Sequence, residues 1–184
     1  GYDPEKAKQL MAEAGYPDGF ELTLGTPNDR YINDEQVAQA VAQMLTRIGI
    51  RTKVDATTAS QFFSRRNALD YPAFLAGWGA ASGEMSSPLK SLVATYNPDA
   101  GLGVTNAGRY SSPEMDALLE KAMVTIDDDE RSELLQQAET IVLNEHGILP
   151  LHYERSAWAM SPKVNYEPRV DQYTLAHTVT QATD

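Results

Sequence analysis

The chain has 184 residues, a hydrophobic fraction of 42% and a formal net charge of -11, values typical of one acidic globular domain or of one lobe of a larger protein. Its 15 Lys and Arg residues are scattered, which argues against a nucleic-acid partner. It contains no cysteine, which excludes a disulfide, a thiolate nucleophile and a cysteine-based zinc site.

The first part of the chain predicts alternating helices and strands. Asp3 has the position of an N-cap before a first-turn proline, and Gly15 ends the helix that follows. A strand is predicted over 20–26 and another over 50–56, with a helix between them that begins at Asn33 or Asp34. We expect these two strands to be parallel. The buried stripe of the first helix is predicted to contain Ala7, Leu10, Met11 and Ala14.

A third strand is predicted over 71–78, after a helix that begins at Thr57 or Thr58. Phe62, Phe63 and Leu69 are the apolar residues that this helix would bury. Repeated strand and helix alternation predicts an α/β fold, with a mixed, mostly parallel sheet flanked by helices.

The second half of the chain begins with a long irregular segment, 79–110, in which 88–94 is a candidate short helix. Ser112 starts one predicted helix, and Asp127 with Glu130 forms a candidate capping box for the next. The remaining strand predictions are 148–153, 156–159 and, more weakly patterned, 173–179.

Catalytic motifs do not fit the sequence well. Ser82 lacks the Gly-x-Ser-x-Gly spacing of a hydrolase nucleophile, and Gly101-Leu102-Gly103 lacks the third glycine of a dinucleotide site. The three histidines include His146 and His152, but their spacing does not place them on one face of an element. A self-contained α/β hydrolase or metal enzyme that uses these two histidines stays open as an alternative, and so does a domain that only makes protein contacts.

A binding surface is the better prediction. Ligands of open α/β sheets bind beyond the carboxyl ends of the strands. Arg30 and Tyr31 follow the first predicted strand, and Trp78 ends the third; they offer a forked cation and two flat aromatic rings. Gly79 would let a ligand approach the backbone. Asn106 and Arg109 form a further polar group before a helix, where a scaffolding role is the alternative.

Four segments resemble a known family. They are YDPEKAKQL at 2–10, AGYPDGF at 14–20, GWG at 77–79 and YSSPEMD at 110–116. Together they resemble the extracellular solute-binding proteins of the dipeptide, oligopeptide and nickel ABC importers (family 5). The resemblance implies a type II periplasmic-binding-protein-like fold with two lobes that close on a ligand. This chain is similar to the carboxyl-terminal lobe, over 1–162, followed by a tail, 163–184, that would return toward the missing amino-terminal lobe.

The resemblance also assigns roles within the predicted site. Arg30 matches an arginine that dipeptide-binding relatives use against the peptide carboxylate, and Trp78 matches a cleft tryptophan. Ala81 departs from the family pattern, because peptide binders have an aspartate there that holds the α-amino group of the ligand. Ser82 replaces an aromatic residue of the nickel-type relatives. The ligand class is therefore not fixed by the resemblance.

The resulting prediction is a monomeric, non-enzymatic ligand-capture lobe that needs no cofactor or metal. It would act outside the cytoplasm, in a periplasmic setting, with its signal peptide outside this sequence. Its partners would be a peptide or other small polar solute, the missing lobe and an ABC permease in the membrane. The predicted ligand-binding residues are Arg30, Tyr31, Trp78, Gly79, Ala81, Ser82, Asn106 and Arg109.

Overall fold

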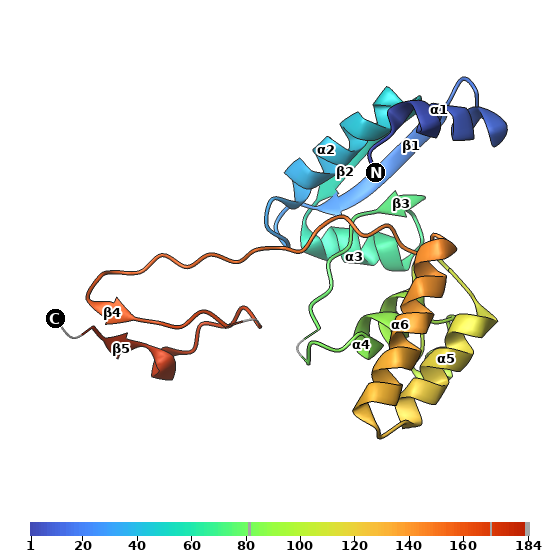
Figure 1. The fold of residues 1–184 in the computed structure, drawn as a ribbon. Helices are drawn as coiled ribbons and strands as arrows, with labels where there is room; N and C mark the ends of the chain where they lie inside the picture. Colours follow the sequence, from blue (N-terminus) through green and yellow to red (C-terminus); the bar gives the residue numbers. More distant parts are fainter. Residues whose placement is uncertain (81, 170, 183–184) are drawn as a thin grey trace.

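The computed structural model describes residues 1–80, 82–169 and 171–182. Its centre is a parallel three-stranded sheet in the order β2-β1-β3, formed by Phe20–Pro27 (β1), Ile50–Thr57 (β2) and Ala73–Phe74 (β3) (Figure 1). β1 and β2 pair over their whole length, from Phe20 opposite Ile50 to Pro27 opposite Thr57. The predicted α/β class and the parallel pairing of the first two strands are confirmed.

Three helices accompany this sheet: Pro4–Glu13 (α1), Asp34–Arg47 (α2) and Ala59–Asn67 (α3). The α1 start is as predicted, since the Asp3 carboxylate accepts a hydrogen bond from the Lys6 N–H at 2.9 Å. α2 and α3 both contact β1 and β2. From Leu24 to Pro27 every residue of β1 is buried, whichever face it points to. This burial pattern is typical of a central strand that is covered on both faces.

An aromatic cluster fills the space between α3 and the sheet. Phe62 is fully buried, and its ring lies 5.7 Å from that of Tyr71 and 6.5 Å from that of Phe74. Gly25 is required beside this cluster, because a Cβ there would lie 2.6 Å from carbons of the Tyr71 ring. Leu69, predicted to be buried with Phe62, is 45% exposed because the chain turns at it with a φ of 63°.

A second core lies in the helical part of the molecule, where Pro113–Val124 (α5) and Asp128–Asn144 (α6) form a hairpin (Figure 1). Asp127 caps α6 by accepting from the Glu130 N–H at 2.9 Å. Ser86–Pro88 (α4) and the π-helical turn Leu89–Val93 (η1) pack against the hairpin, and Pro98–Ala100 (η2) follows. The residues buried in this core are Leu89, Val93, Ala94, Met115, Leu119, Ala122, Leu134, Leu135, Ala138 and Val142.

The third predicted strand is much shorter than expected. β3 pairs with β1 only through Ala73 and Phe74, and the Leu75 N–H then donates to the Gly25 carbonyl at 2.8 Å. β1 ends two residues later at Pro27, which has no N–H to donate to a longer ladder. The chain from Leu75 to Trp78 therefore continues without a partner strand.

The apolar stripe predicted for α1 is not buried. α1 contains no buried residue, and Leu10 is 51% exposed. The helix is amphipathic enough to form, but its apolar side meets no other element strongly enough to be covered.

The strands predicted over 148–153 and 156–159 are wrong. The chain there is irregular, and Leu149 is 71% and Tyr153 96% exposed. An apolar segment forms a strand only where the backbone of a neighbouring strand can pair with it. β3, with two residues, offers few backbone groups for such pairing. The weaker prediction over 173–179 is also wrong, since Ala176–Thr178 forms a 3-10 turn (η3).

The carboxyl-terminal segment leaves the body of the molecule and doubles back on itself (Figure 1). Val164–Asn165 (β4) and Thr180–Gln181 (β5) pair there as an antiparallel hairpin. The division at residue 162 stays a prediction, and irregular chain already begins after α6. No helix in the described part of the chain is long and apolar enough to cross a membrane.

Candidate functional site

The loop after β1 is fixed by Asp34, the first residue of α2. Its buried carboxylate accepts hydrogen bonds from the backbone N–H groups of Arg30 at 3.0 Å, Tyr31 at 3.0 Å and Glu35 at 2.9 Å. The sequence predicts that α2 begins at Asn33 or Asp34, and the structure places Asn33 at the N-cap, with a left-handed φ of 56° and no side-chain cap bond. Asp34 is the first residue of the helix, and its carboxylate binds the loop before α2 as well as the Glu35 N–H.

Tyr31 joins this loop to the segment after β3. Its ring lies directly over Gly77, where an added Cβ would be 2.8 Å from the Tyr31 Cε1 atom. Its hydroxyl is 3.5 Å from the Gly77 carbonyl oxygen, at the limit for a hydrogen bond. The missing side chain at Gly77 therefore lets the loops after β1 and β3 form one surface. We call Arg30, Tyr31, Gly77 and Trp78 the half-cleft surface.

The exposed cation of this surface is Arg30, and a second arginine, Arg66, is buried in α3. The exposed Arg30 guanidinium lies 5.3 Å from the centre of the Tyr31 ring and has no ion-pair partner among the described residues. Arg66 is buried, and its Nη2 donates to the Asn67 side-chain oxygen at 3.0 Å. Burial lowers the pKa of Arg66, and its interaction with Tyr31 partly opposes this. Sequence reasoning missed Arg66, because its burial depends on the tertiary fold.

Trp78 is 42% exposed, and its indole Nε1–H donates to the Ser87 hydroxyl in α4 at 3.2 Å. Gly79 has open space around it, since a Cβ there would meet no atom within 4 Å. The Ser82 hydroxyl accepts from the Glu84 N–H at 3.3 Å. Ala81 lies outside the described residues. We call residues 78–85 the Trp78 loop.

Asn106 and Arg109 lie on the helical core. The Asn106 amide donates to the Ala94 carbonyl at 3.0 Å and to the Tyr110 carbonyl at 2.8 Å, and its oxygen accepts from the Tyr110 N–H at 3.2 Å. Through these bonds the buried Asn106 side chain fixes the conformation of the loop. This is the scaffolding role that the sequence analysis gives as the alternative. Arg109 stacks on the Tyr96 ring at 3.8 Å from its centre. A ligand contact by either residue stays a prediction.

The ion pair between Glu84 and Arg131 is a further feature that sequence reasoning missed. Arg131 donates through Nε and Nη2 to the two carboxylate oxygens of Glu84, with 2.8 Å for the Nη2 contact, although the residues are 47 positions apart. The Ser86 hydroxyl also donates to Glu84. Hydrogen bonds from Arg131, and then from Ser86, lower the pKa of Glu84 to about 2. Each residue alone resembles an ordinary surface charge, so the sequence holds no signal for the pair.

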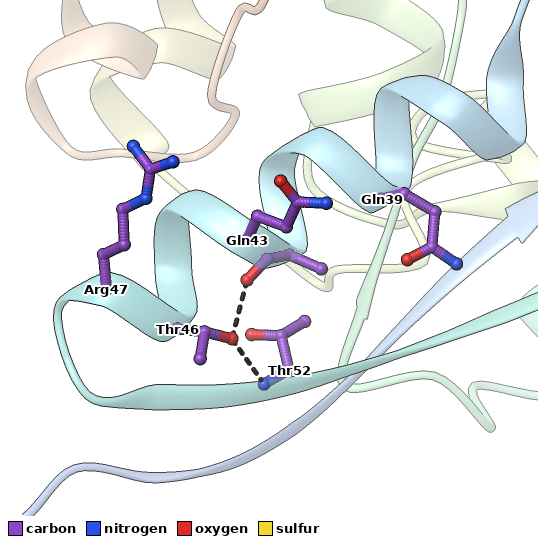
Figure 2. A pocket seen from close by; sticks show the side chains of 6 residues that line it. Gln39, Gln43, Thr46, Arg47 and Thr52 are labelled. Atoms are coloured by element: carbon purple, nitrogen blue, oxygen red, sulfur yellow. Dashed lines mark hydrogen bonds between the residues drawn. The ribbon is translucent and has the colours of Figure 1, made fainter.

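Two hollows in the protein surface lie away from the half-cleft surface. One, of about 310 Å³, lies between α2 and the start of β2 and is lined by Gln39, Ala42, Gln43, Thr46, Arg47 and Thr52 (Figure 2). Thr46 ties its two sides together, since its hydroxyl donates to the Ala42 carbonyl at 2.8 Å and accepts from the Thr52 N–H at 3.5 Å. A second hollow of about 590 Å³ adjoins it along the first residues of β1 and β2. Both are at the opposite end of the strands from Arg30.

The model of the bacterial extracellular solute-binding proteins, family 5 Middle, matches residues 1–100. The chain belongs to this family. The resemblance drawn from the four sequence segments is confirmed.

Curated family 5 relatives match over most of this chain. Heme-binding protein A of Haemophilus influenzae is 31% identical over 171 residues, which are 89% of this chain and 30% of the relative. The glutathione-binding protein GsiB of Escherichia coli K12 is 33% identical over 165 residues, which are 87% of this chain and 32% of the relative. The chain thus spans about a third of the length of the curated relatives it matches.

Solved structures support the fold. The periplasmic binding protein DppA of Helicobacter pylori, in complex with peptide STSA, has a TM-score of 0.71 and 29% identity, over 79% of this chain and 28% of that protein. HbpA2 of Haemophilus parasuis has a TM-score of 0.75 and 24% identity, over 100% of this chain and 38% of that protein. The predicted type II periplasmic-binding-protein-like fold is confirmed.

The metal-enzyme alternative gains no support from the geometry. Within residues 1–80, 82–169 and 171–182, no three His, Asp or Glu side chains gather as a metal site would require. His146 and His152 are exposed, and the Nδ1 atom of His146 is 2.8 Å from the Asn144 carbonyl oxygen. The family match favours solute binding over this alternative.

Proposed function

We propose that this chain is the carboxyl-terminal lobe of an extracytoplasmic solute-binding protein that serves an ABC importer, and that it contributes half of the ligand cleft without catalysing a reaction. The ligand would bridge this lobe and an amino-terminal lobe. Because it binds the closed state better than the open one, it would shift the population toward closure, and the permease would recognise the closed protein. We expect this protein to act as a monomer.

The contact of Tyr31 with Gly77 is the observation that supports this function most. It makes one surface from the loops after two neighbouring parallel strands, at their carboxyl ends, where α/β sheets bind ligands. That surface presents an exposed guanidinium and a part-exposed indole. A ligand resting on it would meet a cation on one side and an aromatic face on the other.

A solute with a carboxylate group fits this surface. Glutathione, haem and a peptide, for which the relatives are named or with which they were solved, all have a carboxylate, and an arginine can bind it through two parallel hydrogen bonds. Arg30 has no ion-pair partner among the described residues, so its guanidinium is available. We therefore propose Arg30 as the carboxylate contact, with Tyr31, Trp78, Gly79 and Ser82 around it. With alanine at 81, no carboxylate is present there for a ligand amino group.

Native mass spectrometry of the full-length protein, purified from its own source, would identify a bound solute. Glutathione, haem and peptide STSA would then be titrated by calorimetry beside that solute. Arg30→Ala should weaken binding of the carboxylate ligand about 10-fold or more, because a charge-assisted hydrogen bond is lost. Arg47→Ala is the matched control, since Arg47 is an exposed arginine beside the hollow under α2.

Equal affinity of the Arg30 and Arg47 variants would contradict the proposed site. This chain alone should bind the same solute much more weakly than the full-length protein, because it supplies only part of the contacts. Submicromolar binding by this chain alone would contradict the half-cleft.

A further inference from the structure

We infer that Glu84, held by Arg131 and Ser86, is a positioning residue that sets the orientation of Trp78 in the half-cleft. We call these three residues the Glu84 clamp. The inference rests on the proposed function only in naming Trp78 as a ligand contact. The clamp itself follows from the hydrogen bonds of the Trp78 loop.

The described part of the Trp78 loop contains two glycines and a turn in which the Gly83 N–H donates to the Ala80 carbonyl at 2.9 Å. Gly79 and Gly83 both stand in open space, with no atom within 4 Å of an added Cβ, and Gly83 has a φ of 71°. Such a segment loses much conformational entropy when it is fixed, so interactions elsewhere must hold it. The described residues show three: the Trp78 indole on Ser87, Glu84 on Arg131, and Met85 packed against the helical core.

The first two of these interactions are linked through α4. Ser86 donates to Glu84, and its neighbour Ser87 accepts from Trp78. Glu84 thus holds the start of α4, and α4 holds the indole. We expect the release of Glu84 to loosen the start of α4 and with it the Ser87 acceptor, while the packing of α4 against α5 keeps the rest of the segment in place.

Arg131 supplies a rigid anchor. It lies in the first turns of α6, and its Nη1 also donates to the Ala122 carbonyl at 2.5 Å, near the end of α5. Leu134 and Leu135, which follow it on α6, are buried in the helical core. The Arg131 side chain is 19% exposed and that of Glu84 34%, so the pair is partly shielded from water. The clamp therefore ties a loose loop of the half-cleft to the most tightly packed helices of the molecule.

Fluorine NMR of the full-length protein labelled with fluorotryptophan would test this inference without a ligand. The Trp78 resonance is assigned by its loss in Trp78→Phe, and its broadening by a dissolved nitroxide measures its exposure. Trp78 is 42% exposed in the parent protein, so full exposure in Glu84→Gln would increase the broadening up to about twofold. Ser87→Ala should act in the same direction, because it removes the indole acceptor and leaves the ion pair.

Glu130→Gln is the matched control. It breaks the exposed Lys121–Glu130 ion pair between α5 and α6 and should leave the Trp78 signal unchanged. The double variant Glu84→Arg with Arg131→Glu restores an ion pair and should return the signal toward that of the parent. An unchanged Trp78 signal in folded Glu84→Gln would overturn the inference.

If Glu84→Gln does not fold, Ser86→Ala decides, because it removes the hydrogen bond that joins Glu84 to α4: greater broadening of the Trp78 signal supports the clamp, and an unchanged signal refutes it. Loss of ligand binding is not a readout here. The clamp can thus fail while Trp78 proves to be a ligand contact, and the proposed function can fail while the clamp holds.

Discussion

The two loops of the half-cleft are held in opposite ways. The loop after β1 is fixed locally, since Asp34 binds N–H groups no more than four positions away in the sequence. The Trp78 loop is fixed from a distance, by an arginine 47 positions away on another core. The first loop is thus determined as soon as α2 forms, whereas the second requires that the sheet and the helical hairpin both be folded.

This difference has a functional consequence. A locally fixed loop keeps its geometry when the rest of the molecule moves, so Arg30 and Tyr31 present a preformed surface. A loop held by one ion pair, one indole hydrogen bond and the packing of Met85 can open at lower cost, as binding segments often do. We therefore expect Trp78 to be the adaptable side of the half-cleft and Tyr31 the rigid side.

The largest effect is expected from Asp34→Ala. It leaves three part-buried N–H groups without their acceptor, which should destabilise the protein by about 2 kcal/mol in urea unfolding. Asp34→Asn keeps an acceptor and should recover part of the loss. Glu35→Ala, at the next position, should cost only a few tenths of a kcal/mol, about the size of a helix-dipole interaction. Equal losses at positions 34 and 35 would show that the loop is not held by Asp34.

A smaller effect is expected from Gly77→Ala, which should separate the two loops. The new Cβ would lie 2.8 Å from the Tyr31 ring, so Tyr31 must move, and we expect a cost of about 1 to 2 kcal/mol. Gly79→Ala, two residues on, meets nothing within 4 Å and should be neutral or slightly stabilising. Urea unfolding of both variants checks this, and a neutral Gly77→Ala would remove the contact that joins the loops.

The Glu84 clamp should make the stability of the protein depend on pH in acid. Arg131 and Ser86 lower the pKa of Glu84 from 4.5 to about 2, so its folded-state partners favour the charged form. Its contribution to stability is complete above 4.5 and is lost as the pH falls toward about 2. The stability difference between the parent and Glu84→Gln should therefore shrink over this range. A difference that stays constant would mean that the Glu84 charge does not stabilise the loop.

The smallest effect on stability is expected from Arg30→Ala, since the Arg30 side chain is exposed and has no ion pair in the described part of the chain. The free energy of unfolding should change by less than about 0.5 kcal/mol. A clearly larger loss would identify Arg30 as a structural residue and weaken its proposed role toward a ligand.

What the sequence could predict follows the same division between local and distant interactions. Asp3, Asp34 and Asp127 stand at or next to predicted helix starts because caps act over three or four residues. The loop that contains Arg30 and Tyr31 could also be predicted, because the interactions that fix it are close in the sequence. β3 was predicted too long, because its length depends on where β1 ends at Pro27.

Distant partners explain the other differences. The apolar segment 148–153 has strand-like composition but no neighbouring strand to pair with among the described residues. Glu84 and Arg131 are two ordinary charges until the fold brings them together. Asn106 was predicted beside the ligand because polar loop residues often bind, yet its amide groups are used by the surrounding backbone. Its contact with a ligand stays a prediction.

A crystal structure of the full-length protein with its co-purified solute would test the half-cleft most directly. We predict a ligand carboxylate within about 3 Å of the Arg30 guanidinium, with the ligand in contact with the Tyr31 and Trp78 rings. A solute bound instead in the hollow between α2 and β2, against Gln39, Gln43 and Arg47, would contradict the account.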